Sequence, residues 1–216
     1  AHELRTPLTA VHLQAQLAAR ATGEAERGAA LAAMKGGLAR ATRLAEQLLA
    51  LARADDAPAA PAKTVDLAVI ARGVVAEQAA VAAARDVDLG LVATLDHPVA
   101  VSGDAAALTT LLSNLVDNAV RYTPAGGEVD VVVETRDGRP VLAVRDTGPG
   151  IPAAEREHVF ERFARGREAS APGSGLGLAI VRRIADAHGA RVALAAGPGG
   201  RGLAVTVTFA APAREP

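Results

Sequence analysis

The hydrophobic pattern of the chain changes at a short segment rich in proline and alanine, ADDAPAAPAK at residues 54–63. Before it, apolar residues recur every three to four positions, which predicts helices. After it, helical segments alternate with runs of valine and leucine that are typical of strands. Two prolines between periodic segments mark a linker. We therefore expect two domains, at 1–54 and 65–211, joined by a linker at 55–64 and followed by a tail at 212–216.

The first domain reads as a hairpin of two helices. Residues 2–19 give one amphipathic helix, and Thr22-Gly23-Glu24 breaks its pattern. Beyond the break, apolar residues recur in heptad fashion from Leu31 to Ala52. Two helices cannot cover both apolar stripes, but two hairpins can hide them in a four-helix bundle. The pattern therefore predicts a homodimer.

The second domain reads as α+β. Asp66 and Asp104 are placed to cap helices, and Asp137-Gly138 is placed to turn between two strands. The expected helices are 66–84, 105–122 and 176–188, and the expected strands are 87–94, 99–101, 128–135, 141–145, 191–195 and 203–209. This mixture predicts helices stacked on a mainly antiparallel sheet.

Charge and cysteine content exclude several classes of protein. The net charge of −1 provides no basic excess for a nucleic-acid groove, so no nucleic-acid partner is expected. The absence of cysteine excludes disulfides and thiolate metal sites, and it fits a reducing compartment. No apolar run reaches the length of a membrane span.

Polar side chains share one face of the helix expected at 105–122. Asn114, Asn118 and Arg121 follow one another at i, i+4 and i+7. Amide oxygens suit Mg²⁺, which shares its other positions with waters and substrate phosphates. Arg121 can add a charge-assisted contact to the same phosphates. A solvated polar face is the alternative, and the motifs downstream argue against it.

Two glycine-containing motifs follow. In DTGPGI at 146–151, the Asp146 carboxylate can accept hydrogen bonds from an exocyclic amino group such as that of adenine, and Gly148 and Gly150 would let the backbone approach a flat ring. In GSGLGL at 173–178, backbone N–H groups and a helix N-terminus converge on a site that favours phosphate. Neither a dinucleotide fingerprint nor a Walker lysine is present.

The segment between these motifs, 152–172, is longer than an ordinary connection and is expected to act as a mobile lid. Phe160 and Phe163 at i, i+3 are expected to pin its short helical turn to the domain. Arg162 and Arg165 beside them are placed to reach phosphates.

A reactive side chain stands at the beginning of the chain. His2, Glu3 and Arg5 place an imidazole, a carboxylate and a guanidinium together on the first expected helix. This stretch looks like a phosphate-accepting histidine, and the motifs near residue 146 look built to bind ATP. Together they suggest an acceptor and a donor for phosphoryl transfer.

Five motifs in order resemble the transmitter region of bacterial sensor histidine kinases, over essentially the whole chain. They are HELRTP at 2–7, NLVDNAVRYT at 114–123, DTGPGI at 146–151, FERF at 160–163 and GSGLGL at 173–178. Each is weak alone, whereas five in order make coincidence very improbable. The resemblance implies a dimerising helical hairpin followed by a Bergerat-type ATP-binding α/β sandwich.

The family's chemistry moves the γ-phosphoryl group of ATP to His2, with Glu3 as the base, and then to an aspartate of a response-regulator receiver domain. Thr6 is implied to position water that dephosphorylates the regulator. The implied cofactors are ATP and Mg²⁺, with Asn114 and Asn118 as metal ligands. The implied nucleotide-binding residues are Asn114, Asn118, Arg121, Tyr122, Asp146, Gly148, Gly150, Ile151, Phe163, Arg165, Gly173, Gly175, Leu176, Gly177 and Leu178.

The resemblance also implies membrane spans and a sensory region upstream, so that this chain is expected to be a cytoplasmic fragment of a sensor anchored in an inner membrane. Three alternatives stay open. A Bergerat-type ATPase or serine kinase is disfavoured by the His2 motif and the heptad hairpin. A catalytically silent dimeric adaptor is expected to lack residues such as Asn118 or Asp146, and both are present. The third alternative is a protein that acts on balance as a phosphatase of the response regulator, which depends on the relative rates of the kinase and phosphatase reactions.

Overall fold

A computed structural model describes the chain apart from residues 1, 57–62, 94–97, 162, 165–174 and 212–216. Side chains are also outside the description at 2–8, 39, 40, 43, 44 and 46–56. The chain separates into two compact units, Ala1–Arg53 and Ala54–Pro216, which are treated one at a time.

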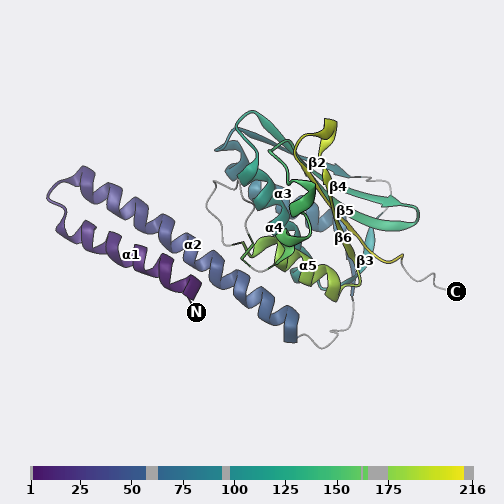
Figure 1. The fold of residues 1–216 in the computed structure, drawn as a ribbon, viewed down its shortest axis with the longest axis horizontal. Coiled ribbons are helices and arrows are strands. Elements are labelled where there is room, and N and C mark those ends of the chain that lie inside the picture. Colours follow the sequence, from purple (N-terminus) through teal and green to yellow (C-terminus); the bar gives the residue numbers. More distant parts are fainter. Residues whose placement is uncertain (1, 57–62, 94–97, 162, 165–174, 212–216) are drawn as a thin grey trace. The chain divides into compact units, whose positions relative to one another are not determined.

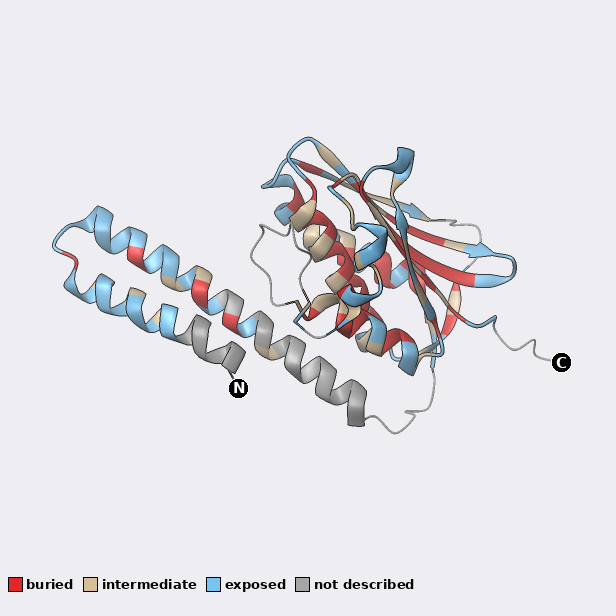
Figure 2. Ribbon diagram, viewed as in Figure 1, coloured by how far each residue is buried: buried red, intermediate tan, exposed pale blue. Residues whose placement is uncertain are grey.

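The first unit is an antiparallel hairpin of α1 (His2–Arg20) and α2 (Glu24–Asp56) (Figure 1). Both predicted helices are confirmed, and α2 extends into the segment expected to be linker. Small residues make the close contacts, because Ala21, Ala30 and Ala41 are buried in the hairpin (Figure 2). Larger apolar side chains in its described part stay exposed: Leu13, Leu17, Leu31 and Leu38.

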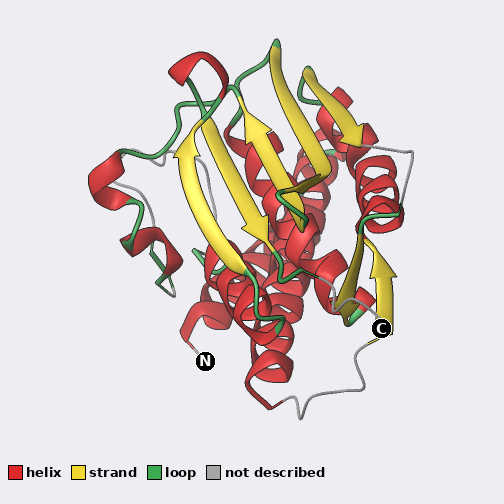
Figure 3. Ribbon diagram, turned by 90° about the vertical axis from the view of Figure 1, so that its right-hand side faces the viewer, coloured by secondary structure: helices red, strands yellow, loops and turns green. Residues whose placement is uncertain are grey.

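The second unit contains a five-stranded sheet with the order β2-β4-β5-β7-β6. Its strands are β2 (Val87–Ala93), β4 (Gly127–Arg136), β5 (Arg139–Asp146), β6 (Arg191–Ala196) and β7 (Leu203–Thr208). The β2–β4 pair is parallel and the other pairs are antiparallel, which confirms a mainly antiparallel sheet. Figure 3 shows the twisted strands of this sheet as neighbouring arrows.

Three helices cover one face of the sheet: α3 (Leu67–Ala83), α4 (Ala105–Tyr122) and α5 (Gly177–Ala187) (Figure 1). The core between the layers consists of aliphatic side chains, among them the fully buried Leu108, Leu111 and Leu112 of α4 and Ile180 of α5. This two-layer arrangement confirms the predicted α/β sandwich.

Both predicted aspartate caps are confirmed. Asp66 Oδ1 accepts from Ala68 N at 2.9 Å, and Asp104 Oδ1 accepts from Ala106 N at 2.8 Å. An N-cap carboxylate satisfies N–H groups that have no partner inside the helix, so each helix begins at a defined residue. The start of α4, and with it the register of its polar face, is therefore fixed.

A small second sheet was not predicted. Strand β1 (Lys63–Asp66) pairs antiparallel with β3 (Ala100–Gly103). The prediction had assigned Lys63 and Thr64 to the linker, yet Thr64 and Val65 are β-branched residues that favour a strand. Between α2 and β1 the chain has only residues 57–62, which is shorter than the expected linker of 55–64.

Candidate functional site

The two asparagines of α4 converge on the start of α5. An ideal Cβ built on Gly177 would lie 3.0 Å from Asn118 Nδ2, 3.4 Å from Asn114 Oδ1 and 3.5 Å from Asn118 Oδ1. Asn114 Nδ2 donates to the carbonyl of Thr110 at 2.8 Å, which orients its amide. Two side chains predicted as ligands are thus brought against the glycine motif that lies far from them in sequence.

The first turn of α5 begins without a side-chain cap. Gly177 is its first helical residue, and Leu176 at the cap position contributes no side-chain hydrogen bond. Leu176 is fully buried and Leu178 is half-buried, so the start of the helix is anchored in the domain. A helix N-terminus beside two amides suits an anion.

Gly175 approaches the backbone of another segment. It has φ of +69°, and a Cβ there would lie 2.7 Å from the carbonyl carbon of Phe163. Phe163 N donates to Gly175 O at 3.0 Å. Glycine is required at this position because both the backbone conformation and the space exclude a side chain.

Asp146 is a buried carboxylate at the end of β5. It is 7% exposed, and its Oδ1 accepts from Gly148 N at 2.9 Å and from Leu203 N at 3.2 Å. Burial raises the pKa of this carboxyl above its ordinary value, while the two N–H bonds lower it. The two hydrogen bonds therefore compensate the Asp146 carboxylate only in part for the hydration that it loses on burial.

The two glycines beside Asp146 pack closely against other parts of the protein. A Cβ on Gly148 would meet Asp146 Oδ1 and Tyr122 O, each at 3.0 Å, and one on Gly150 would meet Gly202 O at 2.5 Å. Glycine therefore makes room for close packing within the protein at both positions, and the approach of this backbone to a flat ring stays a prediction. The two glycines also bring Tyr122 at the end of α4 next to the Asp146 loop.

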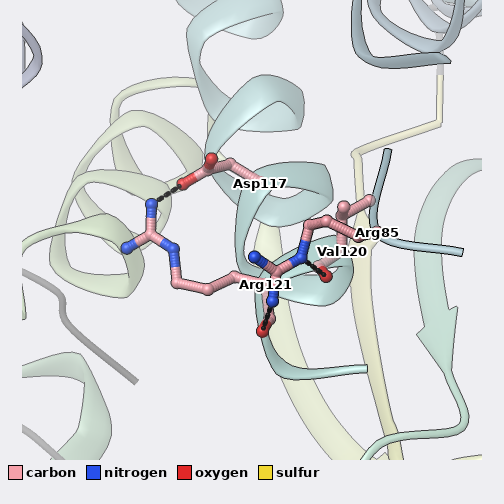
Figure 4. A network of polar contacts seen from close by, with 4 residues as sticks. All are labelled: Arg85, Asp117, Val120 and Arg121. Atoms are coloured by element: carbon pink, nitrogen blue, oxygen red, sulfur yellow. Dashed lines mark hydrogen bonds and ion pairs between the residues drawn. The ribbon is translucent and has the colours of Figure 1, made fainter. Parts of the chain in front are cut away.

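Two arginines organise the last turn of α4 (Figure 4). Arg85 Nε donates to Val120 O at 3.1 Å, and its Nη2 donates to Arg121 O at 2.9 Å. A guanidinium at this end satisfies free carbonyls and opposes the negative end of the helix dipole. Arg121 in turn pairs with Asp117 at 2.6 Å. The turn that carries Arg121 and Tyr122 is therefore held from outside the helix.

The prediction for the two phenylalanines is half wrong. Phe160 is half-buried, with the Arg182 guanidinium 5.3 Å from its ring centre. Phe163 is 46% exposed and has φ of +67°. The short helix His158–Phe160 ends at Phe160, so the two rings do not share a helical face. Phe163 is tied to Gly175 by its backbone N–H instead.

Several predicted residues fall outside the description. His2, Glu3 and Thr6 lie in α1, but their side chains are not described. Arg162, Arg165 and Gly173 are outside the described residues altogether. Of the remaining predicted residues, Ile151 is half-buried at the base of the loop, where its carbonyl accepts from Arg156 Nε at 3.0 Å.

The other described histidines have structural or surface positions. His188 follows α5, where its Nδ1 donates to Ile184 O at 2.8 Å and its Nε2 accepts from Asp104 N at 3.1 Å. These contacts tie the end of α5 to the cap of α4. His158 is fully exposed, and its hydrogen bond to Glu161 raises its pKa. His12 pairs with Gln16 on the surface of α1. His97 lies outside the described residues.

Asp146→Asn is expected to raise thermal stability at pH 7. Because the folded pKa of Asp146 is raised, its ionisation opposes folding; this penalty is complete above the folded pKa and is lost as the pH falls to the ordinary value, 3.8. Asparagine keeps an oxygen for the two N–H donors without the charge. Thermal melts of both proteins between pH 4 and 7 should show a difference that shrinks toward low pH. A variant less stable than wild type at pH 7 contradicts this reading.

In the part of the chain that the structure describes, no helix is both long enough and apolar enough to cross a membrane.

Family models match both units. Residues 1–57 match the His Kinase A (phospho-acceptor) domain, and residues 103–213 match the histidine kinase-, DNA gyrase B- and HSP90-like ATPase. These matches contain the His2 motif and the asparagine, aspartate and glycine motifs that the structure brings together in the second unit.

Known relatives agree. Sensor protein kinase PmrB of Pseudomonas aeruginosa is 41% identical over 209 residues, which covers 96% of this chain and 43% of that protein. Sensor histidine kinase YkoH of Bacillus subtilis is 37% identical over 213 residues, covering 96% and 45%. The solved structure of ShkA matches with a TM-score of 0.71 at 29% identity, over 98% of this chain and 45% of that one.

The chain spans less than half the length of these curated relatives. The matches nevertheless cover nearly all of this chain, including both units. The chain therefore belongs to the bacterial sensor histidine kinases, of which it comprises the phospho-acceptor and ATPase regions.

Proposed function

We propose that this chain transfers the γ-phosphoryl group of ATP to His2 and then to an aspartate of a response-regulator receiver domain. The observation that carries the proposal is the convergence of Asn114 and Asn118 on Gly177, which assembles the predicted nucleotide site from distant motifs. The related ShkA was solved in complex with AMPPNP, an ATP analogue. A kinase should retain acid-labile, alkali-stable label from γ-labelled ATP, whereas a plain ATPase would release all of it as free phosphate.

The donor set at Gly177 fits Mg²⁺. Amide oxygens of Asn114 and Asn118 both lie within 3.5 Å of one point, the ideal Cβ position of Gly177. Hard neutral oxygens from one helix face, with the remaining positions left to waters and phosphates, are what this cation accepts. When bound, Mg²⁺ supplies positive charge that stabilises the transferring phosphoryl group.

Asp146 is proposed to read the amino group of adenine. Its Oδ1 is occupied by two N–H donors of the protein, so the carboxylate has a fixed orientation before any ligand arrives. An ionised carboxylate only accepts hydrogen bonds, and therefore selects a base edge that donates one. The phosphates would then extend toward the start of α5 and the asparagine pair.

His2 is proposed as the nucleophile. A ring nitrogen of neutral imidazole forms the new P–N bond, the bond between the γ-phosphorus and the bridging oxygen breaks, and ADP leaves with that electron pair. Glu3 accepts the proton from the other ring nitrogen, which stabilises the charge developing on the ring. Thr6, one turn further along α1, is proposed to position the water that dephosphorylates the receiver domain.

Dimerisation is proposed through the hairpin. The described part of the hairpin exposes Leu13 by 53%, Leu17 by 48%, Leu31 by 41% and Leu38 by 55%. These leucines belong to the two helices whose apolar stripes predict the bundle. Pairing two hairpins into a four-helix bundle would bury them.

Light scattering at micromolar concentration should give the mass of two chains for wild type and of one chain for Leu31→Lys/Leu38→Lys. Val69→Lys is the matched control, since Val69 is 57% exposed but lies in the other unit. That variant should stay dimeric. A wild-type mass equal to one chain contradicts the proposed dimer.

Attachment to a membrane through segments outside this chain remains a prediction of the family resemblance.

A further inference from the structure

The turn between β6 and β7, residues 197–202 with the sequence GPGGRG, contacts Asp146 directly. Gly197 N donates to Gly202 O at 3.2 Å, which closes the turn. Immediately after it, Leu203 N donates to Asp146 Oδ1 at 3.2 Å, across a separation of 57 residues. The turn thus supplies one of the two hydrogen bonds that hold this carboxylate.

Close backbone packing makes this contact possible. A Cβ on Gly202 would lie 1.8 Å from Asp146 O, and one on Gly197 would lie 2.7 Å from the same oxygen. On the other side, Gly150 packs against Gly202 O, where its own Cβ would be at 2.5 Å. Since backbone atoms cannot move aside as a flexible side chain can, the turn reaches Asp146 only because these three residues are glycines.

The contact also selects one oxygen of the carboxylate. Gly148 N and Leu203 N both bind Oδ1, and within the described part of the chain Oδ2 receives no hydrogen bond. One oxygen is therefore anchored by the protein, which leaves Oδ2 available for a ligand. Burial raises the pKa of Asp146, whereas the N–H groups of Gly148 and Leu203 lower it. The two N–H groups therefore favour the ionised form of the carboxylate.

We propose that the 197–202 turn, through Gly202 and the N–H of Leu203, is a positioning element that gives Asp146 its selectivity for a nucleobase carrying an exocyclic amino group. This inference rests on the proposed function, because it assumes that Asp146 reads adenine. It adds that the reading depends on a segment outside the motifs of the nucleotide site.

The test compares Mg²⁺-ATP with the Mg²⁺ complex of purine riboside triphosphate, which lacks the 6-amino group. Dissociation constants for both are measured by calorimetry on wild type, Gly202→Ala and Leu203→Pro. Leu203→Pro removes the N–H donor itself, and proline is tolerated at the first residue of a strand. Gly200→Ala is the matched control, because Gly200 has φ of +78° against +71° for Gly202 but nothing lies within 4 Å of its Cβ position.

Wild type should prefer ATP by about tenfold or more, as expected for a hydrogen bond to a charged group. Gly202→Ala and Leu203→Pro should lose most of that preference by weakening ATP binding while leaving the analogue nearly unchanged, and Gly200→Ala should keep it. Thermal melts identify any variant that fails to fold. If one of Gly202→Ala and Leu203→Pro does not fold, the other provides the test.

The inference is overturned if folded variants keep the wild-type preference, or if they weaken both nucleotides equally. Failure of the underlying function gives a different result, since wild type itself would then bind neither nucleotide, or would bind both equally.

Discussion

His2→Gln protein should acquire no acid-labile, alkali-stable label from γ-labelled ATP and Mg²⁺, although it binds ATP as tightly as wild type. The physical reason is that glutamine keeps the polarity and approximate size of the side chain but has no nucleophilic ring nitrogen. Removing a nucleophile abolishes the covalent step while leaving binding energy elsewhere in the site intact. Filter-bound label over time, with a parallel ATP-binding isotherm, separates the two effects.

His12→Gln is the matched control, because it makes the same substitution on the same helix at an exposed histidine, whose ring hydrogen-bonds to Gln16. It should label at the wild-type rate. Persistent label in His2→Gln would move the acceptor to another residue, and equal loss in both variants would point to damage to α1 instead of chemistry.

Asn118→Ala should lower the rate of labelling by about a hundredfold or more, the loss typical for removing one electrostatic contact to a transition state. The amide of Asn118 lies beside Gly177 together with that of Asn114. If both bind Mg²⁺ as proposed, alanine leaves the ion with one protein ligand in place of two. The measurement is the initial labelling rate as a function of Mg²⁺ concentration. Excess Mg²⁺ should restore part of the rate, because a weakened metal site is refilled by mass action.

Ser113→Ala truncates a half-buried polar residue on the same helix, next to Asn114 but turned to another side of it. It should leave both the rate and its Mg²⁺ dependence unchanged. Thermal melts confirm that both variants are folded. An Asn118→Ala rate equal to wild type excludes the metal role, and a reduced rate that no Mg²⁺ concentration improves assigns the residue to another task.

Local signals in the sequence predicted the framework well. Asp104 satisfies the N–H groups of the residues that follow it, so the start of α4 could be read from neighbouring positions alone. The 3.6-residue period then placed Asn114 and Asn118 on one face of the helix. The i, i+4 spacing of Asp117 and Arg121 gave the signal for their ion pair, which the sequence interpretation overlooked.

Contacts between distant segments could not be predicted in the same way. Arg85 binds the end of α4 across 35 positions, and Leu203 binds Asp146 across 57. Each bond uses a backbone group on one side, the carbonyl of Val120 in the first and the N–H of Leu203 in the second. Nearly every residue carries both groups, so residue type gives no signal. The prediction for Phe163 was wrong for a related reason. Its i, i+3 spacing from Phe160 places both rings on one face only if the helix continues to Phe163, and the short helix ends at Phe160.

The acceptor can be identified directly by mapping the phosphoryl group after brief reaction with Mg²⁺-ATP. The chain is digested at alkaline pH, where phosphohistidine survives, and the peptides are sequenced by tandem mass spectrometry with a soft fragmentation method. The account predicts a single phosphorylated site, the imidazole of His2. A phosphoryl group on any other residue, or complete conversion of ATP to ADP and free phosphate with unmodified His2, would contradict it.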